Sequence, residues 1–273
     1  MSQITVATLN LRNRQNRWLE RRKLVVAELI DAQPDLISLQ EVYRPIGQGR
    51  WLRNQINSRI SGSSKHPYQI VQKRRQHLIR GYLEGIAIIS RLPILAHDAV
   101  NLGYQGRIAL RTNIELPDRD TLDFVAVHLT HGAQDRQARL EQSMQLTGWL
   151  NDHNPAQKQV IAGDFNEIPS GPAIQLIKQT YRSAFEEFRG SDPIATYPTA
   201  LISRSDGWSG CLDYVFISRA VNRVLSARLF CHRSAAEDPK LFPSDHVGLL
   251  ATLDVGQGAF ETSLPADREN HSH

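Results

Sequence analysis

Short apolar runs, several with alternating polar positions, recur along most of the chain and predict a protein dominated by β-strands. The first strand is predicted at residues 4–9, and others at 36–39, 68–72, 85–90, 108–116, 122–129, 159–162, 212–217, 224–230 and 247–255. Apolar residues spaced three or four apart instead predict helices at 18–33 and 134–152. A third helix is predicted from Pro172 to Thr180.

One order of elements occurs twice in this pattern. A strand, a helix and a second strand span residues 4–41, and a similar unit spans residues 124–166. Each predicted strand ends in polar residues, which are Asn10 and Glu41 in the first unit and His128, Asp164 and Asn166 in the second. Two such units packed face to face bring these ends to one rim. The expected fold class is therefore α/β, a sandwich of two stacked sheets with helices outside.

The chain of 273 residues, 41% of them hydrophobic, is long enough for one large domain. We expect one folded domain at residues 1–257 and a polar, disordered tail at 258–273. No apolar run approaches the roughly 18 residues of a membrane span, so we expect a cytoplasmic protein without stable membrane insertion. The sequence gives no sign of an obligate protein partner. Cys211 and Cys231 are expected to be reduced thiols.

The formal net charge of +4 is modest, but the basic residues are clustered. One cluster runs from Arg12 to Lys23, and a second, at residues 73–80, contains Lys73, Arg74, Arg75, His77 and Arg80. Such clusters attract phosphate groups. The alternative interpretation is a solvated surface segment without a ligand.

Residues 163–166, Gly-Asp-Phe-Asn, follow an apolar run that predicts a buried strand. Because side-chain direction alternates along a strand, Asp164 and Asn166 would point to the same side and could form the floor of a metal or phosphate site. The same four residues are also typical of a turn that Asp or Asn merely caps.

Other polar residues interrupt apolar strand ends in the same way. A carboxylate among apolar neighbours is costly to bury unless it binds a metal, a cation or several hydrogen-bond donors. Repetition of this pattern favours a functional site over isolated structural features. The residues in question are Asn10, Glu41, Glu84, His128, Asp164, Asn166, Asp213, Asp245 and His246.

Seven segments in order resemble the successive motifs of the endonuclease/exonuclease/phosphatase superfamily. They are TLNLRN at 8–13, LQEV at 39–42, EGIAIISRLPI at 84–94, VHLTHG at 127–132, GDFNEIPSG at 163–171, LDYVFIS at 212–218 and PSDHVGLLATL at 243–253. The resemblance implies the four-layered α/β sandwich of deoxyribonuclease I, with two mainly antiparallel sheets and helices on the outer faces. It also implies a divalent cation, usually Mg²⁺ with Mn²⁺ as a substitute, and hydrolysis of phosphate esters.

The resemblance also implies roles for individual residues. Glu41 corresponds to the principal metal ligand, Asn10 to a second metal-site residue and Asp245 to an acidic residue near the metal. Their oxygen atoms are the ligands that Mg²⁺ prefers. Asp164 corresponds to the aspartate that orients the attacking water, and Asn166 to the amide that holds a phosphate oxygen.

Two carboxylate–histidine pairs complete the predicted site. The resemblance implies that Asp213 pairs with His246, and we expect Glu84 to pair with His128. Structural roles remain open for both members of the second pair, with His128 as a strand cap. His131 is interpreted as a turn residue. Arg111 is expected to be a buried guanidinium that steadies the rim, with phosphate contact as the alternative.

The preferred hypothesis is a phosphodiesterase or nuclease that acts on nucleic acid. The basic stretch at 73–80 lies just before Glu84 and would therefore be within reach of the scissile phosphate. Mild basicity does not exclude a phospholipid headgroup or a small phosphorylated metabolite, and Trp51 or Trp208 could contact a membrane. A catalytically silent phosphate-binding module is disfavoured because the acid, amide and imidazole residues are all present.

Overall fold

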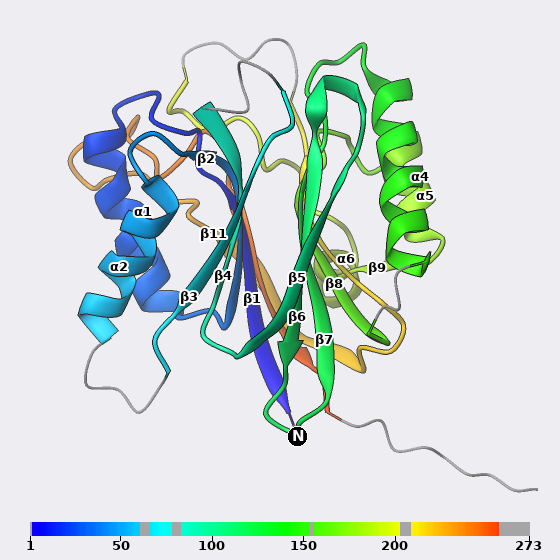
Figure 1. Cartoon of the computed structure of the whole chain (residues 1–273). Coiled ribbons are helices and arrows are strands. Elements are labelled where there is room, and N and C mark those ends of the chain that lie inside the picture. Colours follow the sequence, from blue (N-terminus) through cyan, green and yellow to red (C-terminus); the bar gives the residue numbers. More distant parts are fainter. Residues whose placement is uncertain (1, 61–65, 78–82, 153–155, 203–208, 257–273) are drawn as a thin grey trace, which may run out of the picture.

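The computed structural model describes residues 2–60, 66–77, 83–152, 156–202 and 209–256. Two stacked six-stranded sheets form its centre (Figure 1). The strand order is β11-β12-β1-β2-β4-β3 in the first sheet and β5-β6-β7-β8-β10-β9 in the second. Helices cover the outer faces, which confirms the predicted α/β sandwich.

The first sheet contains strands from both ends of the chain. Its elements and the helices beside them are β1 (Gln3–Asn10), α1 (Trp18–Ala32), β2 (Leu36–Tyr43), α2 (Gln48–Ile60), β3 (Gln69–Arg74), β4 (Glu84–Ser90), β11 (Arg223–Phe230) and β12 (Gly248–Asp254). The second sheet and its helices comprise β5 (Ile94–Asn101), the 3₁₀ turn η1 (Tyr104–Gly106), β6 (Ile108–Glu115), β7 (Thr121–His128), α4 (Arg136–Asp152), β8 (Lys158–Asp164), α5 (Pro172–Lys178), β9 (Arg182–Ser183), α6 (Ala184–Arg189) and β10 (Asp213–Ile217).

The two predicted strand–helix–strand units are the parallel parts of these sheets. β1 pairs with β2 and β7 pairs with β8 in parallel, and all other strand pairs are antiparallel. Parallel neighbours need a long crossover, which α1 and α4 provide. The carboxyl ends of each parallel pair therefore meet at one edge of its sheet.

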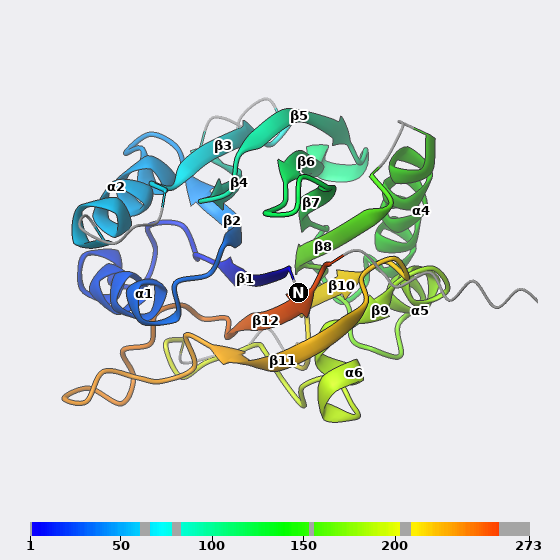
Figure 2. The same cartoon turned by 90° about the horizontal axis from the view of Figure 1, so that it is seen from below.

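Alternating side chains divide the core into three layers. Val6 in β1 and Phe124 in β7 face the other sheet, whereas their neighbours Ala7 and Val125 face the helices. Figure 2 shows α1 and α2 beside the first sheet and α4 beside the second. Central strands thus carry apolar residues on both faces, which is why β8 is buried along its whole length.

Five elements were absent from the sequence-based prediction, namely α2, β5, the 3₁₀ turn η1, β9 and α6. Each buries little apolar surface. In α2, Leu52 and Ile56 are the only fully buried apolar side chains, so the helical spacing of apolar residues is weak in the sequence. β5 is an edge strand with half-buried and exposed side chains. β9 and α6 are short, at two and six residues.

Cys211 and Cys231 are free and buried, and burial raises the pKa of both thiols. Within the described part of the chain, no helix is long and apolar enough to cross a membrane. The predicted tail at 258–273 and the side chains of Arg80 and Trp208 lie outside the described residues.

A pair of glycine substitutions tests the close approach of β7 and β8. A Cβ atom on Gly163 would lie 2.0 Å from the carbonyl oxygen of Val127, whereas one on Gly148 in α4 would meet nothing within 4 Å. We expect Gly163→Ala to lower the free energy of unfolding by about 1–3 kcal/mol through overpacking. Gly148→Ala should raise it by about 0.5–1 kcal/mol, because alanine loses less backbone entropy in a helix. Urea unfolding of both variants measures the difference, and equal effects would contradict this packing.

Candidate active site

The predicted site residues lie at the end of the core between the two sheets. Asn10 ends β1 in one sheet, while in the other sheet Asp164 on β8 is the register partner of both His128 on β7 and Asp213 on β10. In β7, β8 and β10, every second side chain faces the opposite sheet. His128, Asp164 and Asp213 stand at the ends of these rows, so their side chains also point between the sheets. The apolar core thus ends in a layer of polar side chains.

The Asp164 carboxylate is at the centre of this layer. Its Oδ2 atom accepts a hydrogen bond from Asn10 Nδ2 at 3.0 Å and lies 3.6 Å from His128 Nε2 and 3.8 Å from His246 Nε2. Burial raises the pKa of Asp164 to about 6, although the His246 charge opposes this shift. One buried oxygen is therefore shared among groups from three distant segments.

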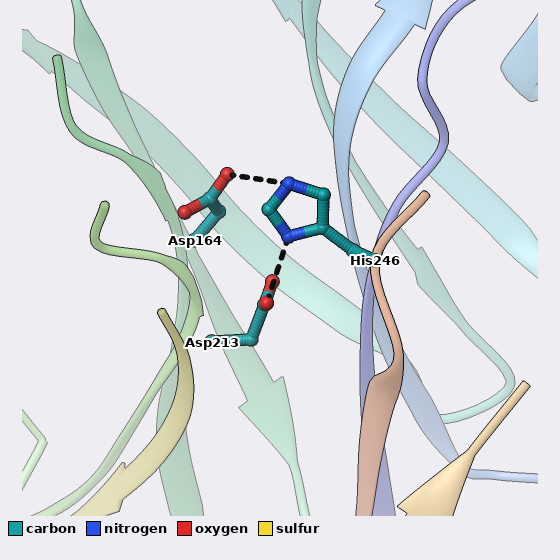
Figure 3. Close-up of side chains that lie close together, drawn as sticks. All are labelled: Asp164, Asp213 and His246. Atoms are coloured by element: carbon teal, nitrogen blue, oxygen red, sulfur yellow. Dashed lines mark hydrogen bonds and ion pairs between the residues drawn. The ribbon is translucent and has the colours of Figure 1, made fainter. Parts of the chain in front are cut away.

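His246 is held between two carboxylates (Figure 3). Its Nδ1 atom is 2.8 Å from Asp213 Oδ2, and its Nε2 atom faces Asp164. Burial alone lowers the pKa of His246, but the charges of Asp213 and Asp164 outweigh it and raise the pKa to about 10. This geometry agrees with the predicted Asp213–His246 pair. The Tyr197 ring packs beside the imidazole at a centroid distance of 4.7 Å.

Glu41 reaches the site through an irregularity in β2. The regular alternation would turn Glu41 toward the helices, since Leu39 and Val42 both pack in that outer core. A register shift between Leu39 and Val42, with a φ of 51° at Glu41, changes the direction of the side chain. Asn10 Nδ2 then lies 3.4 Å from Glu41 Oε1. A left-handed conformation at a non-glycine residue is strained, and such strain is commonly found at functional sites.

Three carboxylates repel one another on this side of the site. Burial, together with the nearby charges of Glu84 and Asp245, raises the pKa of Glu41 to about 7, against the effect of Arg12. Asp245 is fully buried, and its Oδ2 atom is 3.2 Å from Arg12 Nη1 but accepts no hydrogen bond from the described residues. A divalent cation would offset this repulsion.

The donor atoms fit a divalent metal. Glu41, Asp245 and Asn10 offer carboxylate and amide oxygens, which hard cations prefer. Ligand atoms of Asp164, Asp213 and His246 also lie within 4.8 Å of one another and form a second group that could hold a metal. In that group Asp213 already bonds His246, although its Oδ1 atom is buried without a partner among the described residues.

The expected Glu84–His128 pair is not formed, and arginines replace both partners. Arg75 Nη1 donates to Glu84 Oε1 at 2.7 Å, and Arg107 Nη1 lies 2.8 Å from His128 Nδ1. Because a guanidinium only donates, Nδ1 must accept and the proton of a neutral His128 is on Nε2, facing Asp164. Burial, with the Arg107 charge, lowers the pKa of His128 well below its usual value.

Asn166 and its neighbours reconcile the two interpretations of the Gly-Asp-Phe-Asn segment. The backbone N–H of Asn166 donates to Asp164 Oδ1 at 2.9 Å, so Asp164 does cap a turn while it also occupies the site. The Asn166 amide donates to the carbonyl of Leu129. Beyond it, the buried ion pair of Glu167 with Arg139, at 2.9 Å, anchors this loop to α4.

Arg21 organises the loop that follows β1. Its side chain is fully buried and donates to six carbonyl groups, which belong to Leu11, Arg12, Asn13, Gln15, Asn16 and Pro243. Burial lowers the pKa of Arg21 to about 10. The loop therefore wraps around one guanidinium, which also ties it to the segment before Asp245.

A cleft of about 440 Å³ opens beside Glu41. It is lined by basic residues from both predicted clusters and by Arg107 and His131, which the sequence analysis had not assigned to the site. His131, interpreted there as a turn residue, has its Nδ1 atom 3.2 Å from Arg107 Nη2. The lining residues are Arg12, Asn13, Arg14, Gln15, Glu41, Tyr43, Arg75, Leu83, Glu84, Arg107 and His131.

The remaining basic residues divide into different roles. Lys73 is exposed at the edge of the first sheet, as is Arg74, whereas Arg75 is buried in the cleft wall. Arg111 is indeed a mostly buried guanidinium, but it bonds Asp98 and stacks over Trp149, a residue of the outer core against α4, so it does not steady the rim. Neighbouring basic residues of the stretch at 73–80 therefore differ in exposure and in partners.

Solved structures share this two-sheet sandwich fold. An endonuclease/exonuclease/phosphatase structure from Bacteroides vulgatus is 18% identical, covering 94% of this chain and 100% of that one, with a TM-score of 0.71. The catalytic domain of human Nocturnin with a bound sulfate anion is 19% identical over 92% and 93%, with a TM-score of 0.72. TDP2 from Caenorhabditis elegans is 18% identical over 92% and 74%, with a TM-score of 0.74.

The model of the Endonuclease/Exonuclease/phosphatase family matches residues 7–246. The chain belongs to this family, whose members are divalent-metal-dependent hydrolases of phosphoester bonds. No curated protein matches the sequence. The family match confirms the resemblance inferred from the seven motifs.

Replacing Arg21 tests its role in holding the site. Arg21→Met keeps an apolar stem of similar length but leaves buried carbonyl groups without donors, so we expect the free energy of unfolding to fall by about 3–5 kcal/mol. Arg22→Met is the control, because Arg22 stacks over Trp51 on the neighbouring surface. Urea unfolding measures both variants. A loss below about 1 kcal/mol in Arg21→Met would show that the loop does not depend on this side chain.

Proposed function

We propose that this protein is a divalent-metal-dependent phosphodiesterase that acts on nucleic acid. The observation that carries the proposal is the Asp164 carboxylate, buried among Asn10, His128 and His246 at the end of the inter-sheet core. An acid, an amide and two imidazoles that converge from both sheets suit hydrolysis of a phosphate ester better than a purely structural role.

Glu41 is the principal metal ligand in this proposal, with Asn10 and Asp245 as further oxygen donors. The bound cation, Mg²⁺ with Mn²⁺ as a substitute, would neutralise charge on the phosphate and polarise its phosphorus–oxygen bonds. Asn10 contacts both Glu41 and Asp164, so its amide keeps the metal carboxylate and the catalytic carboxylate at a fixed separation.

Asp164 orients and deprotonates the attacking water. Its pKa of about 6 suits this role, because a general base is most effective when its pKa is near the working pH. Asn10 and the Asn166 backbone hold the two carboxylate oxygens, which fixes the orientation of the base before substrate binds.

Two histidines stabilise the phosphate, one as a cation and the other in its neutral form. His246, whose pKa Asp213 helps to raise, is a cation that can bind a phosphate oxygen as negative charge develops. His128 is neutral and can donate a hydrogen bond from Nε2, because Arg107 fixes its tautomer. Asn166 is the third donor in the proposal. Glu84 acts through Arg75 on the cleft wall and not through His128.

The basic residues along the cleft support nucleic acid as the substrate, since a polyanion can contact several of them at once. A phospholipid headgroup or small phosphorylated metabolite is the second candidate. For the lipid, Trp51 is a candidate membrane contact, but its ring packs edge-on against Trp18, which joins α2 to α1. The two free, buried thiols are compatible with the cytoplasmic location that we predict.

Glu41→Gln tests the metal assignment. The substitution preserves shape and removes the charge, so the Mg²⁺ concentration for half-maximal activity should rise at least about tenfold and turnover should fall. Glu141→Gln is the control, because Glu141 is exposed on α4 and bonds only Gln137 among the described residues. An unchanged Mg²⁺ titration in Glu41→Gln, with the fold intact by circular dichroism, would exclude Glu41 as the main ligand.

A double-mutant cycle tests the Asp213–His246 pair. Each single change, Asp213→Ala or His246→Ala, should lower kcat by about 10² to 10⁴. The double variant should be about as slow as the worse single variant, because the two side chains act as one unit. Losses that multiply would mean that the residues contribute independently.

A further inference from the structure

The arginine side chains that line the cleft beside Glu41 differ in how their charges are compensated. Arg12 forms an ion pair with Asp245 at 3.2 Å, and Arg75 forms one with Glu84 at 2.7 Å. Neither Arg14 nor Arg107 has a carboxylate within ion-pair distance among the described residues, although both line the same cleft. The cleft therefore retains positive charge that the protein itself does not neutralise.

Arg107 is the more unusual of the two. Only 4% of its surface is exposed, and its hydrogen bonds go to the imidazoles of His128 and His131. Its Nε atom is buried and has no hydrogen-bond partner among the described residues. Burial of an unpaired cation is costly, so an anion in the cleft would lower the free energy of this arrangement.

Arg14 is exposed at the mouth of the cleft and is partly ordered by an aromatic ring. Its guanidinium lies over Tyr43, 5.0 Å from the ring centroid, and Tyr43 also lines the cleft. Leu83, exposed on 44% of its surface, lies on the same lining. Together they offer a cation beside flat and apolar surface, a combination that suits a phosphate attached to a sugar and base.

The cleft is continuous with the metal-site carboxylates, because Glu41 is itself part of the lining. A phosphate held there would belong to a molecule whose scissile phosphate lies beside Glu41 and Asp164. The scissile phosphate has its own partners in the proposed mechanism, so the uncompensated arginines are available for a different group.

We propose that the cleft binds a second phosphate of a nucleotide substrate, next to the scissile phosphodiester. Arg14 contacts this phosphate, and the buried charge of Arg107 attracts it. This inference rests on the proposed phosphodiesterase function and adds a substrate preference to it. The enzyme would favour nucleotide chains that carry a neighbouring phosphate over a dinucleoside with a single phosphodiester.

The first experiment compares three dinucleotides at saturating Mg²⁺: thymidylyl-thymidine, its 5′-phosphorylated form and its 3′-phosphorylated form. For at least one phosphorylated form, kcat/KM should exceed that of the parent by at least about tenfold, as expected for one charge-assisted hydrogen bond. Arg14→Gln should reduce this ratio to about threefold or less, because the charge-assisted contact to the second phosphate is lost. The form that benefits reports on which side of the scissile bond the cleft lies.

Arg22→Gln is the matched control, because Arg22 also stacks over an aromatic ring, Trp51 at 4.8 Å, but in the surface groove between α1 and α2. This variant should keep the wild-type ratio. A ratio near one in the wild type, or a ratio that Arg14→Gln and Arg22→Gln change equally, would overturn the inference.

A binding measurement separates this inference from the proposed function. Thymidine 3′,5′-bisphosphate contains no phosphodiester, and calorimetry with Mg²⁺ should show it binding at least about tenfold more tightly than either thymidine monophosphate. Arg14→Gln should remove the difference. If this binding pattern holds while no dinucleotide is hydrolysed, the phosphodiesterase proposal fails and the second phosphate site stands. If bisphosphate and monophosphates bind equally in the wild type, the inference fails whatever the activity.

Discussion

The structure depends on one constraint, which is that several carboxylates are buried together where the core between the sheets ends. Asp164, Asp213 and Asp245 are each almost completely inaccessible to solvent. Such groups are tolerated only with donors or cations close by. His246 between Asp213 and Asp164, and Arg12 beside Asp245, meet this need in part. The remaining negative charge around Glu41 is what makes a divalent cation a natural component of the site.

The positions of these groups follow from strand alternation, and for that reason much of the site could be predicted from the sequence. Apolar residues at every second position of β7, β8 and β10 face the opposite sheet, and His128, Asp164 and Asp213 continue those rows. The repeated strand–helix–strand pattern indicated which strands are parallel and hence which ends meet. Elements that bury little apolar surface, such as α2 and β5, leave too weak a pattern to detect.

Side-chain partners could not be predicted in the same way, because pairing depends on which loops meet in space. Glu84 and His128 both occupy inward-facing ends, yet each bonds an arginine from a different loop. Arg107 directly precedes a strand and carried no motif signal. Glu41 depends on a β-bulge, which shifts the alternation by one residue and is invisible in a hydrophobic pattern.

The role of a basic residue in this protein depends on its position in the fold. Arg12, Arg14 and Arg21 are close in sequence, but one neutralises Asp245, one stacks over Tyr43 in the cleft and one is buried as the centre of a loop. The buried Arg21 fixes the backbone from which the other two extend, since it bonds the carbonyls of residues on both sides of them. A single structural cation therefore positions the charge that pairs with Asp245 and the charge that lines the cleft beside Glu41. The three arginines contribute equally to the net charge, but their places in the fold differ. Arg21 holds a loop, Arg12 pairs with a buried carboxylate, and Arg14 lines the cleft.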